Sequence, residues 1–358
     1  MNGPRTREVA REAWRNLASD TTHAPVWAVI LAVVVGLLGW ADTTQVASLT
    51  DQSSAYLAGG GATWIIQAPG RVSGAACDAL ASATGAHGAG ALRATSSPVT
   101  AVALPSAPLP GFEATPGIGT VLGVQVAAGI LLPEPAATSL GVTTDDTLVT
   151  RAGPAPIGAV YPFPDDGRAP ALGYAALILV PPGGFFDQCW ITVWPSSQRT
   201  VNLLYATLSD NANAVDLTPP KLAQLNPTLA SAFDAAGSFA GRFTRWAGLV
   251  CLAAGLTLGY ASLIGRRLEL ASVLHSGWPR PALLGQITLE TAAWVLAGSL
   301  IAACPTVWQA NHAAADTVHL AWLGLRCVAA GAAGAIAGAL AGTALIREKQ
   351  LFALFKTR

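Results

Sequence analysis

Four long apolar stretches, separated by polar segments, dominate the pattern of hydrophobic positions along the chain. Residues 26–41, 246–264 and 283–303 carry almost no charge, and residues 320–346 carry a single charge, Arg326. Each stretch is about as long as a bilayer core requires, roughly 17 to 25 helical residues. The pattern therefore predicts four transmembrane helices, at residues 25–45, 241–265, 282–303 and 319–346.

Composition supports this interpretation. Charged residues make up 11% of the 358 residues, and the mean hydropathy is +0.47. Ordinary soluble domains carry about 25% charged residues. So little charge is typical of a chain that lies largely in lipid, and the predicted class is an α-helical membrane protein of the cell membrane.

Basic residues next to the four stretches predict how the chain is oriented. They cluster before the first stretch, between the second and third, and after the fourth: Arg5, Arg7, Arg11, Arg15; Arg266, Arg267, Arg280; Arg347, Lys349, Lys356, Arg358. Because cytoplasmic segments of membrane proteins carry an excess of Lys and Arg, residues 1–24, 266–281 and 347–358 are predicted to be cytoplasmic, with both termini inside. Residues 46–240 and the loop 304–318 then lie outside.

The large exterior segment is acidic. From residue 42 to residue 241 the sequence holds thirteen Asp and Glu against six Lys and Arg. Affinity for nucleic acid comes mainly from basic groups that neutralise phosphates. The balance argues against nucleic acid as a partner.

The N-terminal segment predicts an amphipathic helix over residues 5–19. Val9, Ala13, Trp14 and Leu17 fall on one side, and the arginines mostly on the other. Such a helix is typical of the inner membrane surface, with its arginines near anionic lipid. A cleaved signal peptide is the alternative for the leader and first apolar stretch. An uncleaved anchor is favoured, since no small-x-small cleavage site follows Trp40 and the apolar run is long.

Short strands and a helix are predicted in the exterior segment, so that it forms a mixed α/β domain inserted between the first and second transmembrane helices. Strands are expected at 63–67, 158–161, 175–180 and 189–194, and a helix at 75–83, from branched or aromatic residues bounded by Pro and Gly. The Pro-rich stretch 98–116 is interpreted as a loop or a boundary, because Pro cannot donate to a strand ladder. We expect one α/β part near the membrane and one mostly β part above it.

The five cysteines divide by compartment. Cys77 and Cys189 are the two in the exterior segment, where oxidation is permitted, and the other three fall in or at the ends of spans. A disulfide between Cys77 and Cys189 is one interpretation. Two buried thiols too far apart to bridge are the other.

Glycines recur every fourth residue in two of the predicted spans. Such spacing lets helix backbones approach closely in lipid, and it predicts tight helix packing through Gly255, Gly259, Gly334, Gly338 and Gly342. Some of that packing could join two copies of the chain. Arg326, about a third of the way into the last span, is expected to snorkel toward the membrane surface, with a place on a substrate path as the alternative.

A short charged hinge, residues 266–281, separates the second and third predicted spans. A motor in the cytoplasm can move an exterior domain only if a shaped surface transmits force through the spans, and a short helix with Gly277 at its turn supplies one. Arg266 and Glu269 lie three residues apart and are expected to pair along the helix. Glu290 lies inside the following span, where a bare charge is costly, and is expected to support the hinge rather than carry protons. Ordinary solvated charge is the alternative for Glu269 and Arg280.

Enzymatic motifs are lacking. The sequence has no G-x-x-x-x-G-K-[ST] phosphate loop and only three lysines, so the chain itself is not expected to be an ATPase. No G-x-S-x-G elbow or Cys/His nucleophile pattern occurs. No catalytic residue and no bound cofactor is predicted. His312, Asp316 and His319 are spaced to share one helical face and form a weak zinc candidate, against a solvated helix start as the alternative.

The whole chain resembles the MacB/FtsX-like permeases of ABC transporters. The resemblance rests on the layout of one span, a large exterior domain and three further spans, and on the hinge. Glu269 and Leu270 match the Glu-Ile pair of the family's hinge, Gly277 its Gly, Arg280 its basic position, and Gln286 and Glu290 the polar positions of the next helix. The leader EAWRNL and the segment TWIIQAPG are also similar. Leu268, Val273 and Trp278-Pro279 depart from the family pattern.

The resemblance implies a permease subunit that works by mechanotransmission. A separate cytoplasmic ABC ATPase, holding ATP and Mg, would drive a pair of permeases, either two copies or this chain with a homologue, to export or extract a hydrophobic compound, peptide or lipid. An extracytoplasmic protein is a further possible partner. A signalling module that activates a cell-wall hydrolase without transport is an alternative, and a ligand-binding sensor without a motor is another.

Overall fold

The computed structural model describes residues 6–195, 197–209, 218–313 and 316–346. The described chain forms two compact units: a helical unit, residues 6–51 and 236–346, and a sheet unit, residues 52–235. The chain passes between them within helix α2 (Ala24–Ala58) and within helix α7 (Ala235–Gly241). The sheet unit is inserted after the first long helix, in the predicted order.

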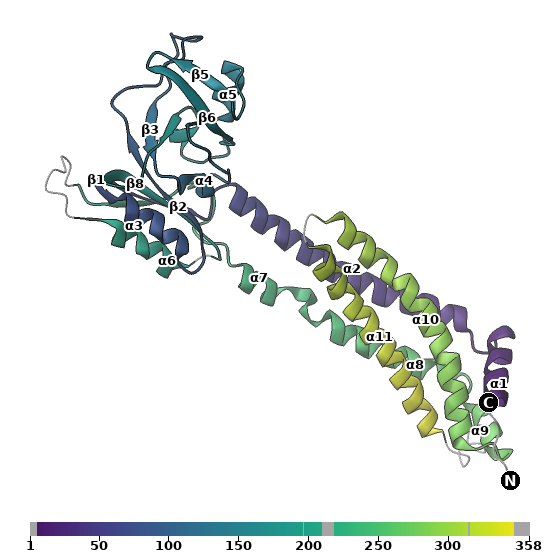
Figure 1. Cartoon of the computed structure of the whole chain (residues 1–358). Helices are drawn as coiled ribbons and strands as arrows, with labels where there is room; N and C mark the ends of the chain where they lie inside the picture. The colour runs from purple at the N-terminus through teal and green to yellow at the C-terminus, as the bar shows by residue number, and fades with distance from the viewer. Residues whose placement is uncertain (1–5, 196, 210–217, 314–315, 347–358) are drawn as a thin grey trace. The chain divides into compact units, whose positions relative to one another are not determined.

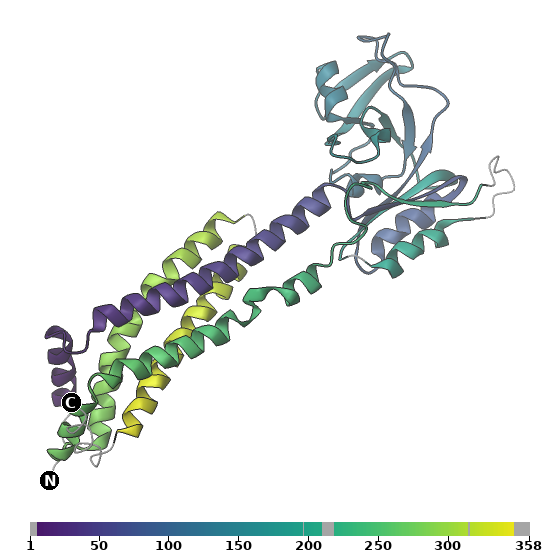
Figure 2. The same cartoon turned by 180° about the vertical axis from the view of Figure 1, so that it is seen from behind.

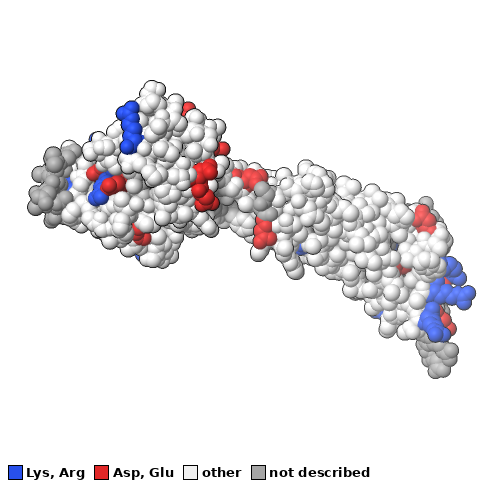
Figure 3. All heavy atoms as spheres, turned by 45° about the horizontal axis from the view of Figure 1, so that its top comes forward, with Lys and Arg blue, Asp and Glu red and all other residues white. Residues whose placement is uncertain are grey.

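In the described part of the chain, four helices are long and apolar enough to cross a membrane, and all belong wholly or mostly to the helical unit. They are α2, the segment Phe243–Ile264 formed by η4 (Phe243–Trp246) and α8 (Ala247–Ile264), α10 (Arg280–His312) and α11 (Thr317–Leu345). In Figure 3 the visible surface of this unit is nearly free of charge along its length, and its basic side chains gather at one end. This distribution is what four spans with charged ends require.

Two of these helices exceed the predicted spans. α2 has 35 residues and continues past residue 45, and α10 has 33 residues and runs through 304–312, which the sequence pattern assigned to an outer loop. Pro305 lies inside α10. A membrane helix tolerates such a proline because neighbouring helices help to satisfy the backbone groups it frees. Four residues separate α10 from α11.

Helices α8 and α11 run side by side and in the same direction (Figures 1 and 2). A Cβ atom built on Gly255 would lie 2.1 Å from the carbonyl oxygen of Gly331, and one on Gly259 would lie 1.9 Å from that of Ala335. On the α11 side, Cβ atoms on Gly334 and Gly338 would lie 2.2 and 2.0 Å from carbonyl oxygens of α8, and one on Gly342 would lie 3.0 Å from a leucine methyl. The five glycines thus face the α8–α11 contact, where only a missing side chain allows this approach.

The N-terminal helix α1 (Thr6–Ala18) packs against α10. Val9 and Ala13 are buried, whereas Trp14 is 72% exposed. The predicted apolar face is therefore only partly correct, since Trp14 does not share the burial of Val9 and Ala13. Contact with a neighbouring helix, rather than the amphipathic pattern alone, decides which face is covered. The predicted Arg5 lies outside the described residues, as does the basic tail 347–358.

A single sheet with nine described strands forms the sheet unit, in the order β5-β6-β4-β7-β3-β2-β8-β1-β9. Its strands are β1 (Thr63–Ser73), β2 (Ala86–Ala94), β3 (Gly111–Ala114), β4 (Ile130–Pro133), β5 (Thr147–Thr150), β6 (Gly153–Tyr161), β7 (Ala176–Leu179), β8 (Phe185–Val193) and β9 (Lys221–Gln224). Strands β3 and β7 run parallel, as do β4 and β6, and the other neighbours run antiparallel. The mixed α/β character is confirmed.

Short helices cover the sheet and close its cores. They are α3 (Gly74–Ala79), η1 (Leu80–Ser82), α4 (Ile118–Val121), α5 (Glu134–Leu140), η2 (Pro170–Leu172), α6 (Gln198–Asn202) and η3 (Leu203–Thr207). One core joins Ile66 of β1 and Ile191 of β8 to Cys77 of α3, and another gathers around Tyr161 and Trp190. Alternate strand residues supply these cores, as period-two burial requires.

The predicted strands at 63–67, 158–161, 175–180 and 189–194 lie within or overlap β1, β6, β7 and β8, and the predicted helix 75–83 corresponds to α3 followed by η1. The interpretation of 98–116 as a loop or boundary is partly wrong. Strand β3 lies inside that stretch and pairs with both β2 and β7. Strand β3 joins β2-β8-β1-β9 to β5-β6-β4-β7 in one continuous sheet.

Candidate functional site

The hinge between the second and third apolar helices contains a short helix, α9 (Arg267–His275), as predicted. It is followed by a turn in which Gly277 has a φ of +89°, a value that residues with a Cβ atom rarely adopt. The Gly277 N–H donates to the carbonyl of Leu274 at 3.1 Å, and α10 begins at Arg280, next to two prolines. Gly277 therefore allows the chain to reverse immediately after α9.

Arg266 joins the hinge to the following helix. Its Nε and Nη2 atoms donate to the two carboxylate oxygens of Glu269 at 3.1 and 3.0 Å, and its Nη1 donates to Glu290 Oε2 at 2.6 Å. A guanidinium forms this paired contact better than any other cation because its donors form a flat fork. The predicted pairing of Arg266 with Glu269 is present, and the Arg266–Glu290 bond adds a buried second partner.

Glu290 also bonds to the N-terminal helix. Its Oε1 atom accepts from Asn16 Nδ2 at 2.7 Å and from Gln286 Nε2 at 3.0 Å, and the residue is buried. One carboxylate thus receives donors from α1, from the start of the hinge and from α10. We call Asn16, Arg266, Glu269, Gln286 and Glu290 the hinge network.

Electrostatics favours the charged form of Arg266 in this network. Burial by itself lowers the pKa of the Arg266 guanidinium, but the hydrogen bonds and charges of Glu269 and Glu290 outweigh that effect and hold its pKa above the ordinary value. Charge-assisted hydrogen bonds in a low-dielectric setting are stronger than neutral ones, and they fix geometry. The network therefore fixes the position of the hinge relative to α1 and α10.

A cavity of about 310 Å³ opens beside the network, between α1 and α9. Its lining mixes charged, polar and apolar side chains: Glu12, Arg15, Asn16, Glu269, Leu270, Val273, Ser276, Trp278, Leu283 and Gln286. The indole Nε1 of Trp278 is buried and has no hydrogen-bond partner among the described residues. The side chain of Glu269 is 47% exposed, and Arg280 is also exposed. The surface beside the hinge network therefore combines exposed charge with apolar side chains.

Arg267 differs from the other hinge charges. Its Nη2 donates to the hydroxyl of Tyr260 at 2.7 Å, and its guanidinium lies over the Tyr260 ring. This contact joins the start of α9 to the end of α8. Among the predicted coupling residues, Arg266, Glu269 and Glu290 are brought together, whereas Arg267 and Arg280 lie apart from them.

A second buried network contains Arg326, which does not simply snorkel as expected. Arg326 Nη2 donates to Asp42 Oδ2 at 2.8 Å, while Arg242 Nε and Thr244 Oγ1 donate to Asp42 Oδ1 at 3.2 and 2.5 Å. Asp42 is fully buried. We call Asp42, Arg242, Thr244 and Arg326 the Asp42 network; it ties α2, η4 and α11 together. Arg326 thus pairs with a buried carboxylate, while its own side chain stays partly exposed.

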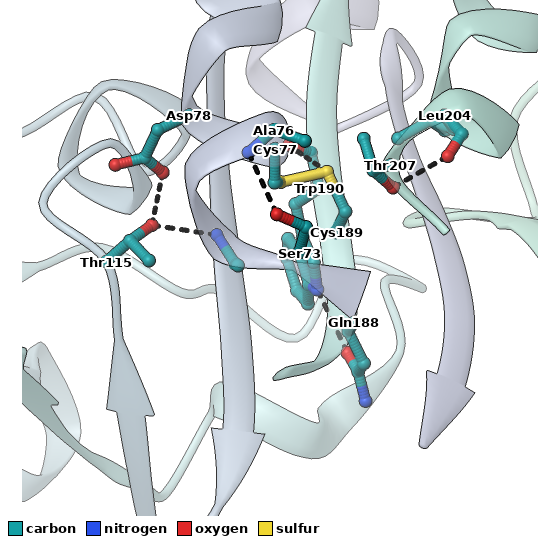
Figure 4. Close-up of a disulfide and its surroundings, with 11 residues drawn as sticks. Ser73, Ala76, Cys77, Asp78, Thr115, Gln188, Cys189, Trp190, Leu204 and Thr207 are labelled. Atoms are coloured by element: carbon teal, nitrogen blue, oxygen red, sulfur yellow. Dashed lines mark hydrogen bonds between the residues drawn. A yellow bond between two sulfur atoms is a disulfide. The ribbon is translucent and has the colours of Figure 1, made fainter. Parts of the chain in front are cut away.

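Cys77 and Cys189 form a disulfide between α3 and β8 (Figure 4). The same view shows Thr115 Oγ1 donating to the carboxylate of Asp78, next to the disulfide. Burial is the largest influence on Asp78 and raises its pKa, although hydrogen bonds from Thr115 and Gly117 oppose it. The disulfide fastens one helix of the sheet unit to a central strand.

The weak zinc candidate does not form a site. His312 is the last residue of α10, whereas Asp316 caps α11 by accepting from the backbone N–H groups of Val318 and His319. The three residues therefore do not share one helical face. Asp316 pairs with His319 at 2.7 Å, which with the two backbone bonds lowers the pKa of Asp316. No group of three metal-ligating side chains occurs among the described residues.

Asn16, Asp42, Arg242 and Thr244 are the site residues that sequence reasoning missed. Asn16 lies three residues after Ala13 and seven after Val9, so a polar side chain on the buried face of α1 was the available signal. Asp42 directly follows the apolar stretch 26–41, so the sequence pattern indicates only that it marks the end of a span. Its partners, Arg242 and Arg326, lie 200 and 284 residues away in sequence.

No family model matches the chain, and no curated protein matches it. Among solved structures, the periplasmic region of MacB from Actinobacillus actinomycetemcomitans is similar to it with a TM-score of 0.30 and 10% sequence identity, covering 41% of this chain and 84% of that one.

Proposed function

We propose that this chain is the permease subunit of an ABC transporter, driven by a separate cytoplasmic ATPase. Four apolar helices, an α/β unit inserted after the first, and a short hinge helix after the second support this proposal. The order is that of the permeases the sequence resembles. In this proposal the hinge and both termini are cytoplasmic, and the sheet unit lies outside.

The observation that carries the proposal is the hinge network. A load applied to α9 reaches α10 through the Arg266–Glu290 bond, and it reaches α1 through the Asn16–Glu290 bond. Solvated hinge charges would not hold the hinge to the spans, so they would not pass a load on the hinge to α1 and α10. Buried, multiply bonded charges move with the helices that hold them.

The exposed part of the hinge is the proposed contact for the motor. A segment of the ATPase would dock at the cavity between α1 and α9, where the side chain of Glu269 is half-exposed. Arg15 and Glu269 at the same cavity would add charge recognition. ATP and Mg would be held by the partner subunit, and a second permease copy or a homologue would complete the transporter.

The proposed work is export or extraction of a hydrophobic compound, peptide or lipid at the outer membrane face. Closure of the motor on ATP would move the hinge, the spans would follow, and the sheet unit would change its arrangement around the substrate. Mechanotransmission of this kind needs no catalytic residue on this chain.

Affinity purification tests the proposal. The full chain is tagged in its own cells and purified gently, and co-purifying proteins are identified by mass spectrometry. We expect a phosphate-loop ATPase to accompany the wild type and to be lost from a Glu269→Ala, Trp278→Ala variant. Glu134→Ala, an exposed change in the sheet unit, is the matched control and should retain the ATPase. Absence of any ATPase from the wild type would overturn the proposal.

A further inference from the structure

The Asp42 network holds more positive than negative charge. Two guanidinium groups, of Arg242 and Arg326, share one carboxylate, that of Asp42. Among the ion pairs of the described residues, neither arginine has another acidic partner. A net charge of about +1 therefore remains within a largely apolar helical unit, where an unbalanced charge is costly.

Of the two arginines, Arg326 is the one whose side chain is exposed at the surface of the helical unit. Arg242 is buried, donates from Nη1 to the carbonyl of Phe239 at 2.7 Å, and lies 3.8 Å from the Phe239 ring centre. The side chain of Arg326 is 42% exposed. Its hydrogen bond to Asp42 is donated by Nη2. A guanidinium has five N–H donors, so Arg326 keeps donors that face outward.

The depth of the network is set by the length of α2. Asp42 lies about 27 Å along this helix from Ala24, at about 1.5 Å per residue. The hydrocarbon core of a bilayer is about 30 Å thick. If α2 enters the core near its first residue, the network lies where the opposite layer of headgroups begins.

Three exposed tryptophans lie close in sequence to residues of the Asp42 network. Trp40 precedes Asp42 by two residues, Trp246 follows Thr244 by two, and Trp322 precedes Arg326 by one helical turn; all three are exposed. Tryptophan concentrates at membrane–water interfaces because its ring is apolar and its N–H is polar. Trp322 and Arg326, four residues apart, lie on one face of α11.

We propose that Arg326 binds the phosphate of an anionic phospholipid in the leaflet opposite the hinge. The guanidinium fork matches phosphate oxygens, and a headgroup of net charge −1 balances the surplus of the network. Trp322 supplies an interfacial surface beside the same lipid. The inference rests on the four helices crossing a membrane and does not depend on the proposed motor.

Lipid binding by the purified full chain tests the assignment. Native mass spectrometry in detergent compares phosphatidylglycerol with phosphatidylcholine for the wild type, Arg326→Gln, Arg326→Lys and Arg151→Gln, the last being an exposed arginine of the sheet unit. We expect phosphatidylglycerol to bind more tightly than phosphatidylcholine. Arg326→Gln should weaken its affinity about fivefold, Arg326→Lys should largely keep it, and Arg151→Gln should not change it.

Three results would overturn the assignment. The first is equal affinity of the wild type for the two lipids, and the second is an Arg326→Gln affinity equal to that of the wild type. The third is displacement of phosphatidylglycerol by inorganic phosphate at matched concentration, which would mean a site for the free ion. If Arg326→Gln fails to fold, as judged by size-exclusion chromatography, Arg326→Lys and the wild-type lipid preference decide the question. If no ATPase co-purifies with the wild type but the lipid preference holds, only the proposed function fails.

Discussion

Arg266 Nη1 lies 2.6 Å from Glu290 Oε2, and this bond joins two residues 24 positions apart at the junction of the hinge and α10. Both side chains are almost fully buried. Asn16 reaches the same carboxylate from α1, so three segments meet at Glu290. Because the bond is buried, its loss would leave an unbalanced charge rather than a solvated one.

Glu290→Gln is expected to destabilise the full chain strongly. The change removes the buried negative partner of Arg266, and breaking a buried pair in this way costs about 3 kcal/mol or more. Thermal unfolding in detergent or nanodiscs measures the effect. Glu269→Gln is the matched control, since its half-exposed side chain makes a contact worth about 1 kcal/mol or less. Equal losses for the two variants would contradict the central place of Glu290.

Gly259→Ala is expected to separate α8 from α11. The added Cβ would lie 1.9 Å from the carbonyl oxygen of Ala335, so the helices must move apart, at a cost of about 1–3 kcal/mol. Gly248→Ala, in the same helix, places its Cβ in open space and should change stability by less than about 1 kcal/mol. Unfolding by denaturant in mixed micelles compares the two. A larger loss for Gly248→Ala would show that the contact is misassigned.

Local patterns predicted much of this architecture. The four apolar stretches, the hinge helix and the fourth-residue glycine spacing each depend on residues near in sequence, and each appears in the structure. Contacts between distant residues could not be predicted in this way. Asn16 forms a hydrogen bond with Glu290, 274 residues away in sequence, and Arg326 forms one with Asp42, 284 residues away.

The sheet shows the same division between local and distant contacts. Strands β1, β6, β7 and β8 were expected from branched and aromatic residues, whereas β2, β4, β5 and β9 were not. Strand β3 is only four residues long and lies in a Pro-rich stretch, so its pairing with β2 and β7 has no local signal. The end of α10 was also missed, since the helix continues through Pro305 to His312.

Removal of the disulfide is expected to destabilise the sheet unit. The bridge closes a loop across 112 residues, and restricting the unfolded chain over such a loop is worth about 2–5 kcal/mol. A Cys77→Ser, Cys189→Ser variant should lose hydrogen-exchange protection in β1 and β8. Cys304→Ser, which changes an exposed free thiol, should keep it. Unchanged protection in the double variant would mean that the bridge contributes little.

The pH dependence of stability should carry a contribution from Asp78. Its pKa is raised in the folded state, mainly by burial, so the native protein binds a proton more tightly than the unfolded chain. This contribution is fully present below the ordinary pKa of 3.8 and is lost as the pH rises through the higher folded value. Asp78→Asn should flatten the profile there and be at least as stable at neutral pH, because its amide oxygen can still accept from Thr115.

Asp166 is the control for that profile. Hydrogen bonds from Arg168 are the main reason that the pKa of Asp166 is lowered, so its contribution has the opposite sign and disappears as the pH falls. Unfolding midpoints of the wild type, Asp78→Asn and Asp166→Asn are measured from pH 3 to 7. The two variants should differ from the wild type in opposite directions, and parallel shifts would contradict the assignment.

Cys251 and Cys327 provide a direct test of the register between α8 and α11. They are 76 positions apart, as are Gly255 and Gly331 and also Gly259 and Ala335, and both are buried in the same apolar cluster. Oxidation with copper phenanthroline should therefore link Cys251 to Cys327 within one chain, as mass spectrometry of cleaved peptides would show. Replacing either cysteine by serine should abolish the link, whereas Cys304→Ser should not. A slip of one helical turn between the helices would separate the thiols, so failure of the wild type to cross-link would contradict the parallel register that the glycines define.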